Sequence, residues 1–443
     1  MQALPRFRRR PLEWSLRLFA DVREGEAATA LLLTLNVFLI LTAYYLLKVA
    51  REPLILLGGG AEVKSYASVG QSILLVLVTS IYGWLATRVA RMALIAWVSG
   101  FFIADLVVFW ALGERGVPLG VPFFLWVGIF NVTTVAQFWS FAADVYSEEQ
   151  GKRLFPIVGI GSSVGAVAGA WVADELLFLG PFRLMLVASL LLVVCVVLTY
   201  AVHRRDTHPS GHAPRQEVES PLSGANGFAL VLRDRYLLLF AGLIFVLNWV
   251  TKTGDYVLDR KLLDAAHDAA LNHGVKASLY VGQFKARYFE WVNVLGVVLQ
   301  LLAVSRVIKY LGLRAALLIM PFASLAGYGA AFVAPVLGVL FAARVVESSL
   351  EYSLSNTTRQ ALWLLTSRNA KYKAKQVIDT FIVRAGDVMS AGLVWIGSRN
   401  GLPLRGFIGA TVILTFQWVL LAFLLGRSYA RLSSQHAIGA QVA

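Results

Sequence analysis

The sequence predicts an all-α membrane protein in which twelve transmembrane helices form two halves of six. The first observation is composition: 58% of the 443 residues are hydrophobic. The mean hydropathy of +0.68 lies well above the usual range for a soluble domain of this length. The second is a series of apolar segments, each close to the roughly 20 residues that cross a bilayer as a helix. The third is a single polar stretch that divides these segments equally.

The apolar segments define the order of the elements. After the sixth comes HRRDTHPSGHAPRQEVESPLSGANG, which is rich in Pro, Gly and Ser and is expected to be a flexible connector. We therefore expect a cytoplasmic amphipathic arm (1–26), a first half (27–203), a cytoplasmic linker (204–227), a second half (228–427) and a cytoplasmic tail (428–443). The expected spans are 27–49, 66–87, 92–112, 119–146, 154–179, 182–203, 228–254, 286–308, 311–332, 334–365, 374–397 and 405–427.

Arginine and lysine residues fall mainly between the apolar segments and alternate onto one side of the membrane. The positive-inside rule assigns that side, with both termini, to the cytoplasm. Because loop orientation accounts for the net charge of +14, we do not expect nucleic-acid binding. A bacterial inner membrane is the expected location. The amino-terminal arm is interpreted as a helix lying on the membrane surface, with organellar targeting as the alternative.

No residue pattern indicates catalysis or a metal site. Cys195 is the only cysteine, which excludes a disulfide within the chain and any site built from several cysteines. Three histidines in the linker have a spacing that could bind a metal, but Pro209 and Gly211 would break the helix that this needs. The glycines of GIGSSVGAVAG in the fifth span fail the spacing of nucleotide loops and fit close helix packing. We therefore expect no enzyme activity, cofactor or resident metal.

The two halves share a weak internal repeat. YSEEQGKRLFPIVGIG before span five can be aligned with LTSRNAKYKAKQVID before span eleven, which superposes Lys152 on Lys371. YYLLK in span one can likewise be aligned with NWVTK in span seven, which superposes Lys48 on Lys252. Two halves of six helices with a cytoplasmic linker are the layout of the major facilitator architecture, in which the substrate sits between the halves at mid-depth.

Charged side chains inside the expected spans are the candidate site residues, because a lipid-facing charge at mid-membrane costs at least about 2.5 kcal/mol. Lys48, Arg51 and Glu52 lie within one turn near the end of span one. The two cations suit an anionic substrate, or alternatively they extend toward the membrane interface. In span seven, Lys252 and Asp255 form either an internal ion pair or a substrate contact.

Spans ten and eleven carry the densest intramembrane charge. Arg344, Glu347 and Glu351 recur at helical spacing along one face of span ten. These charges either contact a substrate or gate its cavity, or they neutralise one another inside the bundle. The full set in the two spans and at their cytoplasmic mouth is Arg344, Glu347, Glu351, Lys371, Lys373, Lys375, Asp379, Arg384 and Asp387.

Three segments are similar to the ATP/ADP translocase family of nucleotide transporters found in plastids and bacteria. They are YYLLKVAREPLIL, FWSFAADVYSEEQGKRLFPIVGIGSSVG and SLEYSLSNTTRQALWLLTSRNAKYKAKQVIDTFIVRAGD. The resemblance follows essentially the whole chain in order, and it implies a twelve-helix facilitator fold and nucleotide transport. The residues that match the family's pattern are Lys48, Arg51, Glu52, Lys373 or Lys375, Asp379 and Arg384.

Two positions depart from the family pattern. Thr251 stands where a glutamate is expected in span seven, and Phe124 stands where span four should carry a carboxylate. The expected function is alternating-access transport of nucleotides such as ATP and ADP, or of a related phosphorylated anion. The alternatives are transport of another organic anion, perhaps with protons, and a non-transporting scaffold or lipid-handling module. The expected partners are the anionic small molecule and the lipid bilayer, and nothing indicates a protein partner.

Overall fold

The structure is a computed structural model that describes the chain except residues 1–22, 24–25, 87, 206–226, 367–372 and 443. The amino-terminal arm, most of the linker and Lys371 therefore lie largely or wholly outside the described residues. Within the described part the secondary structure is helical, with no strand.

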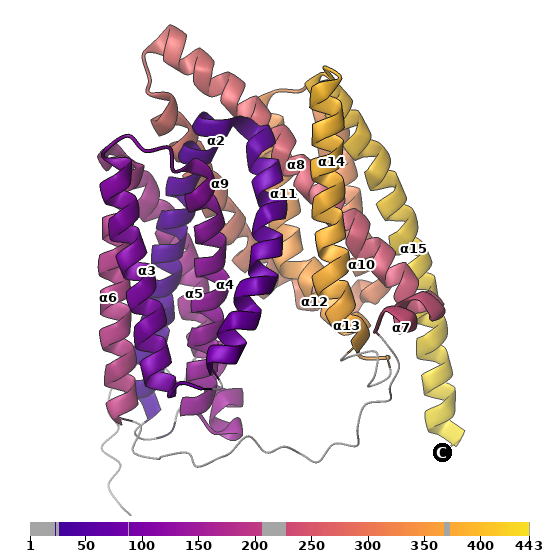
Figure 1. The fold of residues 1–443 in the computed structure, drawn as a ribbon. Coiled ribbons are helices and arrows are strands. Elements are labelled where there is room, and N and C mark those ends of the chain that lie inside the picture. Colours follow the sequence, from indigo (N-terminus) through magenta and orange to yellow (C-terminus); the bar gives the residue numbers. More distant parts are fainter. Residues whose placement is uncertain (1–22, 24–25, 87, 206–226, 367–372, 443) are drawn as a thin grey trace, which may run out of the picture. The chain divides into compact units, whose positions relative to one another are not determined.

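Six crossings come from the first part of the chain. They are formed by α2 (Glu26–Ala86), α3 (Arg91–Gly113), α4 (Gly120–Val145), α5 (Glu148–Leu176) with the short η1 (Leu177–Leu179), and α6 (Pro181–Arg205). With 61 residues, α2 is far longer than one crossing needs, and it is broken at Gly60, where φ is 81°. Figure 1 shows the chain reversing direction between the two arms of α2. Pro53 lies inside the first arm of α2, and the break comes seven residues later, at Gly60.

Six more crossings follow the linker. The first is α7 (Gly227–Arg233) with α8 (Arg235–His273). The next two lie in one run of helix, α9 (Ala277–Leu299), η2 (Gln300–Val304) and α10 (Ser305–Val333), which is broken at Gly312, where φ is 78°. The fourth crossing consists of α11 (Leu337–Leu350), η3 (Glu351–Ser355) and α12 (Asn356–Leu362). The fifth consists of α13 (Lys375–Val377), η5 (Ile378–Ile382) and α14 (Val383–Arg399). The sixth is α15 (Leu404–Val442).

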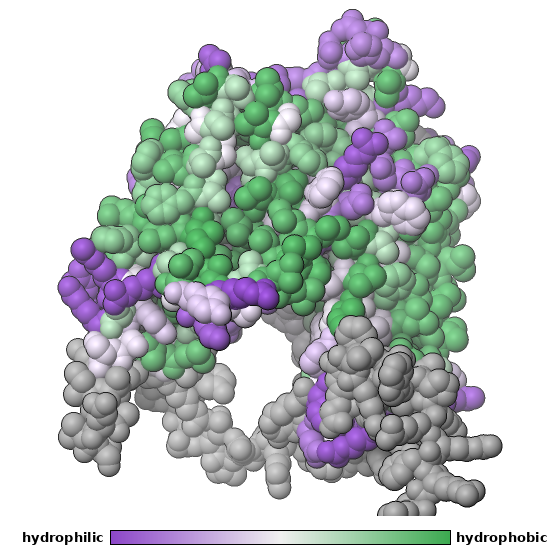
Figure 2. Space-filling model, turned by 180° about the vertical axis from the view of Figure 1, so that it is seen from behind, coloured by the Kyte–Doolittle hydropathy of each residue, from purple (hydrophilic) through white to green (hydrophobic). Residues whose placement is uncertain are grey.

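These helices confirm the predicted twelve-helix membrane protein. Eight described helices are long and apolar enough to cross a membrane. The breaks at Gly60 and Gly312 divide two of them into pairs. The helices that contain η3 and η5 carry the charges predicted for spans ten and eleven, and they bring the described crossings to twelve. On the face shown in Figure 2, hydrophobic residues cover most of the surface. Many large apolar side chains point outward, among them Trp97 and Leu190, which are 66% and 65% exposed.

One expected element is different in the structure. No span is expected between residues 254 and 286. Instead α8 continues to His273 and α9 begins at Ala277, so that only three residues separate the two helices. Helix formation continues here although the hydropathy falls, because α8 and α9 pack on each other and on α11.

The described chain divides into two compact units. The first contains residues 1–51 and 74–216, and the second contains 52–73 and 217–443. In the first unit, α5 packs closely on α2, because Gly161 and Gly165 face backbone atoms of Thr34 and Phe38. A Cβ at Gly165 would lie only 2.4 Å from the Phe38 carbonyl oxygen. In the second unit, Gly386 of α14 meets the backbone of α8 in the same way. Close helix packing is therefore the role of Gly161 and Gly165 in span five, whereas a Cβ at Gly159 would meet nothing within 4 Å.

Candidate functional site: a buried charge cluster in the second unit

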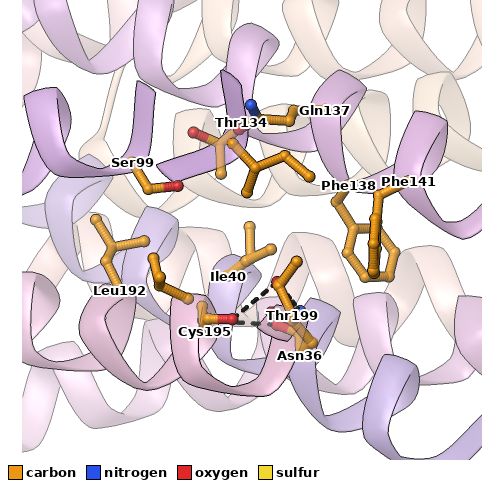
Figure 3. A pocket seen from close by; sticks show the side chains of 12 residues that line it. Asn36, Ile40, Ser99, Thr134, Gln137, Phe138, Phe141, Leu192, Cys195 and Thr199 are labelled. Atoms are coloured by element: carbon orange, nitrogen blue, oxygen red, sulfur yellow. Dashed lines mark hydrogen bonds between the residues drawn. The ribbon is translucent and has the colours of Figure 1, made fainter. Parts of the chain in front are cut away.

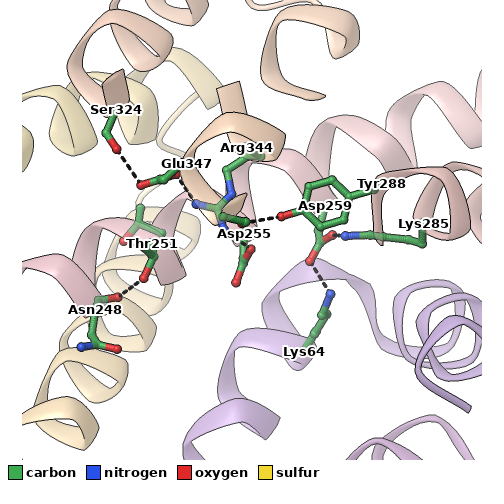
Figure 4. Close-up of polar contacts among 12 residues, drawn as sticks. Lys64, Asn248, Thr251, Asp255, Asp259, Lys285, Tyr288, Ser324, Arg344 and Glu347 are labelled. Atoms are coloured by element: carbon green, nitrogen blue, oxygen red, sulfur yellow. Dashed lines mark hydrogen bonds and ion pairs between the residues drawn. The ribbon is translucent and has the colours of Figure 1, made fainter. Parts of the chain in front are cut away.

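The second unit contains a cluster of charged side chains that pair with one another, and all of them are largely buried except Asp255, whose side chain is 41% exposed. They come from the 52–73 part of α2, from α8, from α9 and from α11. Figure 4 shows side chains from these helices converging on two ion-pair groups that lie next to each other. We call this set the charge cluster; its members are Glu52, Lys64, Asp255, Asp259, Lys285, Arg344 and Glu347.

The first group is centred on two lysines that share two carboxylates. Lys64 Nζ lies 2.5 Å from Glu52 Oε2 and 2.7 Å from Asp259 Oδ2. Lys285 Nζ also pairs with Asp259 and lies 3.7 Å from Glu52 Oε2. The two carboxylate side chains are at most 2% exposed, and the lysines are 13% and 4% exposed. This group is therefore a buried square of two cations and two anions.

The second group is centred on Arg344, whose side chain is 3% exposed. Its guanidinium donates to Asp255 Oδ1 at 2.5 Å and to Glu347, one turn further along α11. Glu347 also accepts hydrogen bonds from Tyr328 Oη at 2.6 Å and from Ser324 Oγ at 3.1 Å. This carboxylate is thus fully enclosed by donors, as a buried charge requires.

The cluster is close to charge balance. Three basic side chains face four carboxylates, and Lys252 on α8 interacts electrostatically with Asp255 as a fourth base. An incoming anion would therefore have to compete with protein carboxylates for the same bases. The arrangement suits exchange of charge partners better than a permanently open anion pocket.

Several predicted residues lie elsewhere in the second unit. Arg384 donates to Ser72 Oγ at 3.0 Å and to Asp387 Oδ2 at 3.2 Å, which links α14 to the second arm of α2. Lys375 donates to the amide oxygen of Gln360 at 2.9 Å. Asp379 lies in the η5 turn, where its side chain is accessible and within electrostatic reach of Lys375 and Arg359.

Lys373 lies just before α13 and is half-buried. Glu351, expected to point inward, opens the π-helical η3 turn, with Lys252 and Arg359 in electrostatic reach. Turns of this kind occur frequently at functional sites. The charged faces of spans ten and eleven therefore each contain a π-helical turn, which no simple helical spacing predicts.

The remaining two predicted cations belong to the first unit, where aromatic rings surround them. Lys48 Nζ lies 4.9 Å from the centre of the Tyr45 ring. The Arg51 guanidinium lies 4.6 Å from the centre of the Phe124 ring, which is a cation–π distance. Phe124 is the residue that replaces the carboxylate expected in span four, so an aromatic face occupies the position of that negative charge.

Thr251, the second departure from the expected pattern, makes a hydrogen bond within its own helix. Its hydroxyl donates to the Asn248 carbonyl at 3.2 Å within α8, and the side chain is buried beside the charge cluster (Figure 4). A buried neutral hydroxyl with a backbone acceptor needs no cation partner. With threonine in place of the expected glutamate, this position carries no charge, and its hydroxyl is satisfied by the Asn248 carbonyl.

Sequence reasoning missed three members of the charge cluster as site residues. Lys64 was expected just before span two, and Asp259 and Lys285 were expected in a loop between spans. A signal existed in the spacing Lys252, Asp255 and Asp259, which continues one charged helical face beyond the expected end of span seven. The described residues contain no group of His, Cys, Asp and Glu side chains arranged to hold a metal ion.

Comparisons with known proteins place the fold. No protein-family model matches the sequence, and no curated protein matches it. Solved structures do match, among them a bacterial homologue of the iron transporter ferroportin, with a TM-score of 0.62 and 14% identity over 92% of this chain and 99% of that chain. A peptide transporter POT gives a TM-score of 0.62 at 15% identity over 94% and 99% of the chains.

The nucleoside transporter NupG matches as well, with a TM-score of 0.61 and 13% identity over 91% of this chain and 99% of that chain. Sequence identities this low say nothing about a shared substrate, but the coverage extends over nearly the full length of each chain. Together with the apolar helices, these matches show an integral, multi-pass membrane protein with the twelve-helix major facilitator fold.

Proposed function

We propose that this chain is a membrane transporter that moves nucleotides of the ATP/ADP type, or a related phosphorylated anion, by alternating access. The observation that carries the proposal is the charge cluster of the second unit (Figure 4). Each buried ion costs several kcal/mol to desolvate. A folded protein is often just as stable when apolar residues of similar volume replace a buried ion pair. Stability of the fold therefore gives little reason for such a cluster, whereas an anionic substrate gives one.

The proposed role of the cluster is exchange of partners. Phosphate oxygens have the charge and geometry to replace carboxylates at Arg344, whose guanidinium can form two parallel hydrogen bonds. In the absence of substrate, Asp255 and Glu347 neutralise this arginine and limit its desolvation cost. Substrate binding would release carboxylates that hold α8 and α11 together, which links occupancy of the site to helix movement.

Other cations have supporting roles in the proposal. Lys48, Arg51 and Lys252 are the further candidates for phosphate contacts, and the resemblance to nucleotide translocases supports Arg51 among them. Arg384, Lys373 and Lys375 would attract the anion from the cytoplasm, because clustered positive charge raises the local anion concentration. On the positive-inside rule we place both termini in the cytoplasm and the protein in a bacterial inner membrane.

Two observations favour a second candidate function. Phe124 and Thr251 replace carboxylates that the similar nucleotide transporters would carry, and both are buried and accommodated in the structure. A chain altered at both positions is suited to transport of a different organic anion. The same changes fit a scaffold or lipid-handling module that keeps the fold without transport.

The deciding experiment measures the melting temperature of the purified protein with ATP, ADP, other nucleotides, inorganic phosphate and organic anions. A ligand that binds only the folded state at about 100 times its Kd adds about 2.7 kcal/mol to stability. We expect a rise with ATP or ADP that is lost in Arg51→Ala, followed by nucleotide uptake in proteoliposomes. No rise with any nucleotide, from well-folded protein, would refute the nucleotide assignment.

A matched control separates loss of substrate contact from loss of packing. Arg88 also stacks on an aromatic ring, with its guanidinium 4.1 Å from the centre of the Trp84 ring, but it is exposed at a turn. Arg88→Ala should therefore keep the nucleotide-dependent rise that Arg51→Ala loses. Equal loss in both variants would mean that Arg51 has no special contact with the anion.

A further inference from the structure

The first unit contains a small cavity, mainly apolar in surface but with several polar groups in its wall, that the proposed transport function does not use. It lies between the first arm of α2, α3, α4 and α6, inside the helix bundle of this unit. Figure 3 shows polar side chains from all four helices around it. The polar residues lining it are Asn36, Ser99, Thr134, Gln137, Cys195 and Thr199, and the remainder of the lining is apolar.

One wall of the cavity is a fixed hydrogen-bond chain between α2 and α6. Asn36 Nδ2 donates to Thr199 Oγ1 at 2.8 Å, and the Thr199 hydroxyl donates to the Cys195 carbonyl at 2.9 Å. The Cys195 thiol lies 3.8 Å from the Asn36 carbonyl oxygen. These bonds fix the orientation of the Asn36 amide, so that its Oδ1 atom is turned away from Thr199.

Polar atoms at this cavity lack partners among the described residues. Asn36 is fully buried, yet its Oδ1 accepts no hydrogen bond there, and the Thr134 hydroxyl has no partner either. Gln137 is 6% exposed, and its side chain interacts with the Tyr82 hydroxyl. Its Nε2 atom nevertheless has no hydrogen-bond acceptor among the described residues. A buried polar group left in this state costs about 1–3 kcal/mol, so a guest that satisfies several of them is favoured.

The chemistry of the lining restricts that guest. No charged side chain lines the cavity. A bare cation would face the N–H bonds of Gln137, and an anion would face the Asn36 oxygen. A guest that both donates and accepts hydrogen bonds satisfies Asn36, Thr134 and Gln137 together, and water is the smallest molecule that does so.

The size agrees with the chemistry. The cavity has a volume of about 30 Å³, and a bound water needs at least roughly 10–15 Å³. We propose that the cavity is a binding site for two ordered water molecules, which bridge Asn36 on α2 to Thr134 and Gln137 on α4. The waters take the place of direct polar contacts between these helices.

The second unit contains a smaller cavity between corresponding helices, with Arg359 in its lining. This cavity of about 10 Å³ lies between α8, α10, the η3–α12 segment and α15, which are the first, third, fourth and sixth crossings of that half. These are the same ordinal crossings that enclose the larger cavity. The Thr358 hydroxyl in its lining also lacks a partner among the described residues. One water fits this volume, so both halves of the fold leave a hydrated gap at corresponding helices.

The native cysteine gives a direct test by hydroxyl-radical footprinting, in which X-ray radiolysis of water oxidises side chains next to it. Cys195 lines the cavity and is 5% exposed, and Met185 on the same helix is fully buried away from the cavity lining. Both sulfur side chains are reactive, so Met185 is the internal control. We expect oxidation of Cys195 at least several-fold faster than that of Met185. Equal protection of both would overturn the proposal, because the cavity would then be dry.

A variant that fills the cavity checks that the reactive water is the bound one. Ser99→Leu should displace the waters and bring Cys195 oxidation down to the Met185 level. It should also melt at a lower temperature than Ser99→Ala, because the Asn36 oxygen is then left without a donor. In a dry cavity, the larger side chain would raise the melting temperature instead. Persistent Cys195 oxidation in Ser99→Leu would also overturn the two-water site, and oxidation in the unaltered protein remains decisive if this variant does not fold.

Discussion

The contact between α5 and α2 makes a sharp prediction, because the two helices meet backbone to backbone at Gly165. An alanine methyl group there would lie 2.4 Å from the Phe38 carbonyl oxygen and 2.8 Å from its Cα atom. Ordinary carbon–oxygen contacts between helices are about 3.3–3.6 Å, so the helices must separate by roughly 1 Å. No side chain can rotate to relieve the clash, since both atoms belong to the backbone.

The size of the effect follows from a comparison within the same helix. Overpacking of this kind costs typically about 1–3 kcal/mol. Replacing a helical glycine by alanine also contributes up to about 1 kcal/mol of helix propensity in the opposite direction. Gly159 on α5 provides the reference, because a Cβ there would meet nothing within 4 Å. The propensity gain cancels between the two variants, so Gly165→Ala should be about 1–3 kcal/mol less stable than Gly159→Ala.

The assay is thermal unfolding of both purified variants in the same detergent, followed by intrinsic tryptophan fluorescence. We expect Gly159→Ala to melt at or slightly above the temperature of the unaltered protein, and Gly165→Ala to melt about 1–3 °C below Gly159→Ala. If Gly165→Ala melts as high as Gly159→Ala, the close approach of α5 to α2 is absent in the folded protein, and the packing role of Gly165 is wrong.

Two further predictions concern the charged residues. Arg344→Leu should destabilise the protein by about 3–5 kcal/mol, because it leaves Glu347 buried without its cation. The double variant Arg344→Leu/Glu347→Leu should recover much of that loss. Thermal unfolding of both variants measures the difference, and a double variant no more stable than the single variant would contradict the prediction. Phe124→Glu places a carboxylate where the Arg51 guanidinium now stacks on the ring. Because this carboxylate would pair with Arg51, Phe124→Glu should weaken the rise in melting temperature that an anion causes, while Phe124→Leu should retain more of that rise. An equal rise in both variants would show that Arg51 does not contact the anion.

The crossings were largely predictable because hydropathy reports directly on the cost of placing a helix in lipid. Even the charged spans ten and eleven were anticipated, although the helices that carry them, α11–α12 and α13–α14, are shorter or interrupted by π-helical turns. The extension of α8 to His273 was not predicted, because the hydropathy falls there and the helix is stabilised by packing against its neighbours. Hydropathy separated the spans on either side of Gly60 and close to Gly312, but it could not show that a single glycine with positive φ makes each break.

The candidate site was predictable residue by residue but not pair by pair. Glu52, Asp255, Arg344 and Glu347 were identified as intramembrane charges, yet a pattern of spacing along one helix cannot reveal a partner on another. Lys64 pairs with Asp259 across 195 residues of sequence. Such a contact depends on how helices pack, which is a property of the whole unit.

The two departures from the nucleotide-translocase pattern differ in what they do to charge. At Thr251 a carboxylate is replaced by a hydroxyl whose hydrogen bond closes within its own helix, so the site there becomes locally neutral. At Phe124 the replacement keeps contact with Arg51 through the face of the ring, which attracts a cation without cancelling its charge. The second change therefore strengthens the positive field around Arg51 relative to a carboxylate. For an anion transporter, it is a change of affinity and selectivity, and it leaves the means of binding an anion in place.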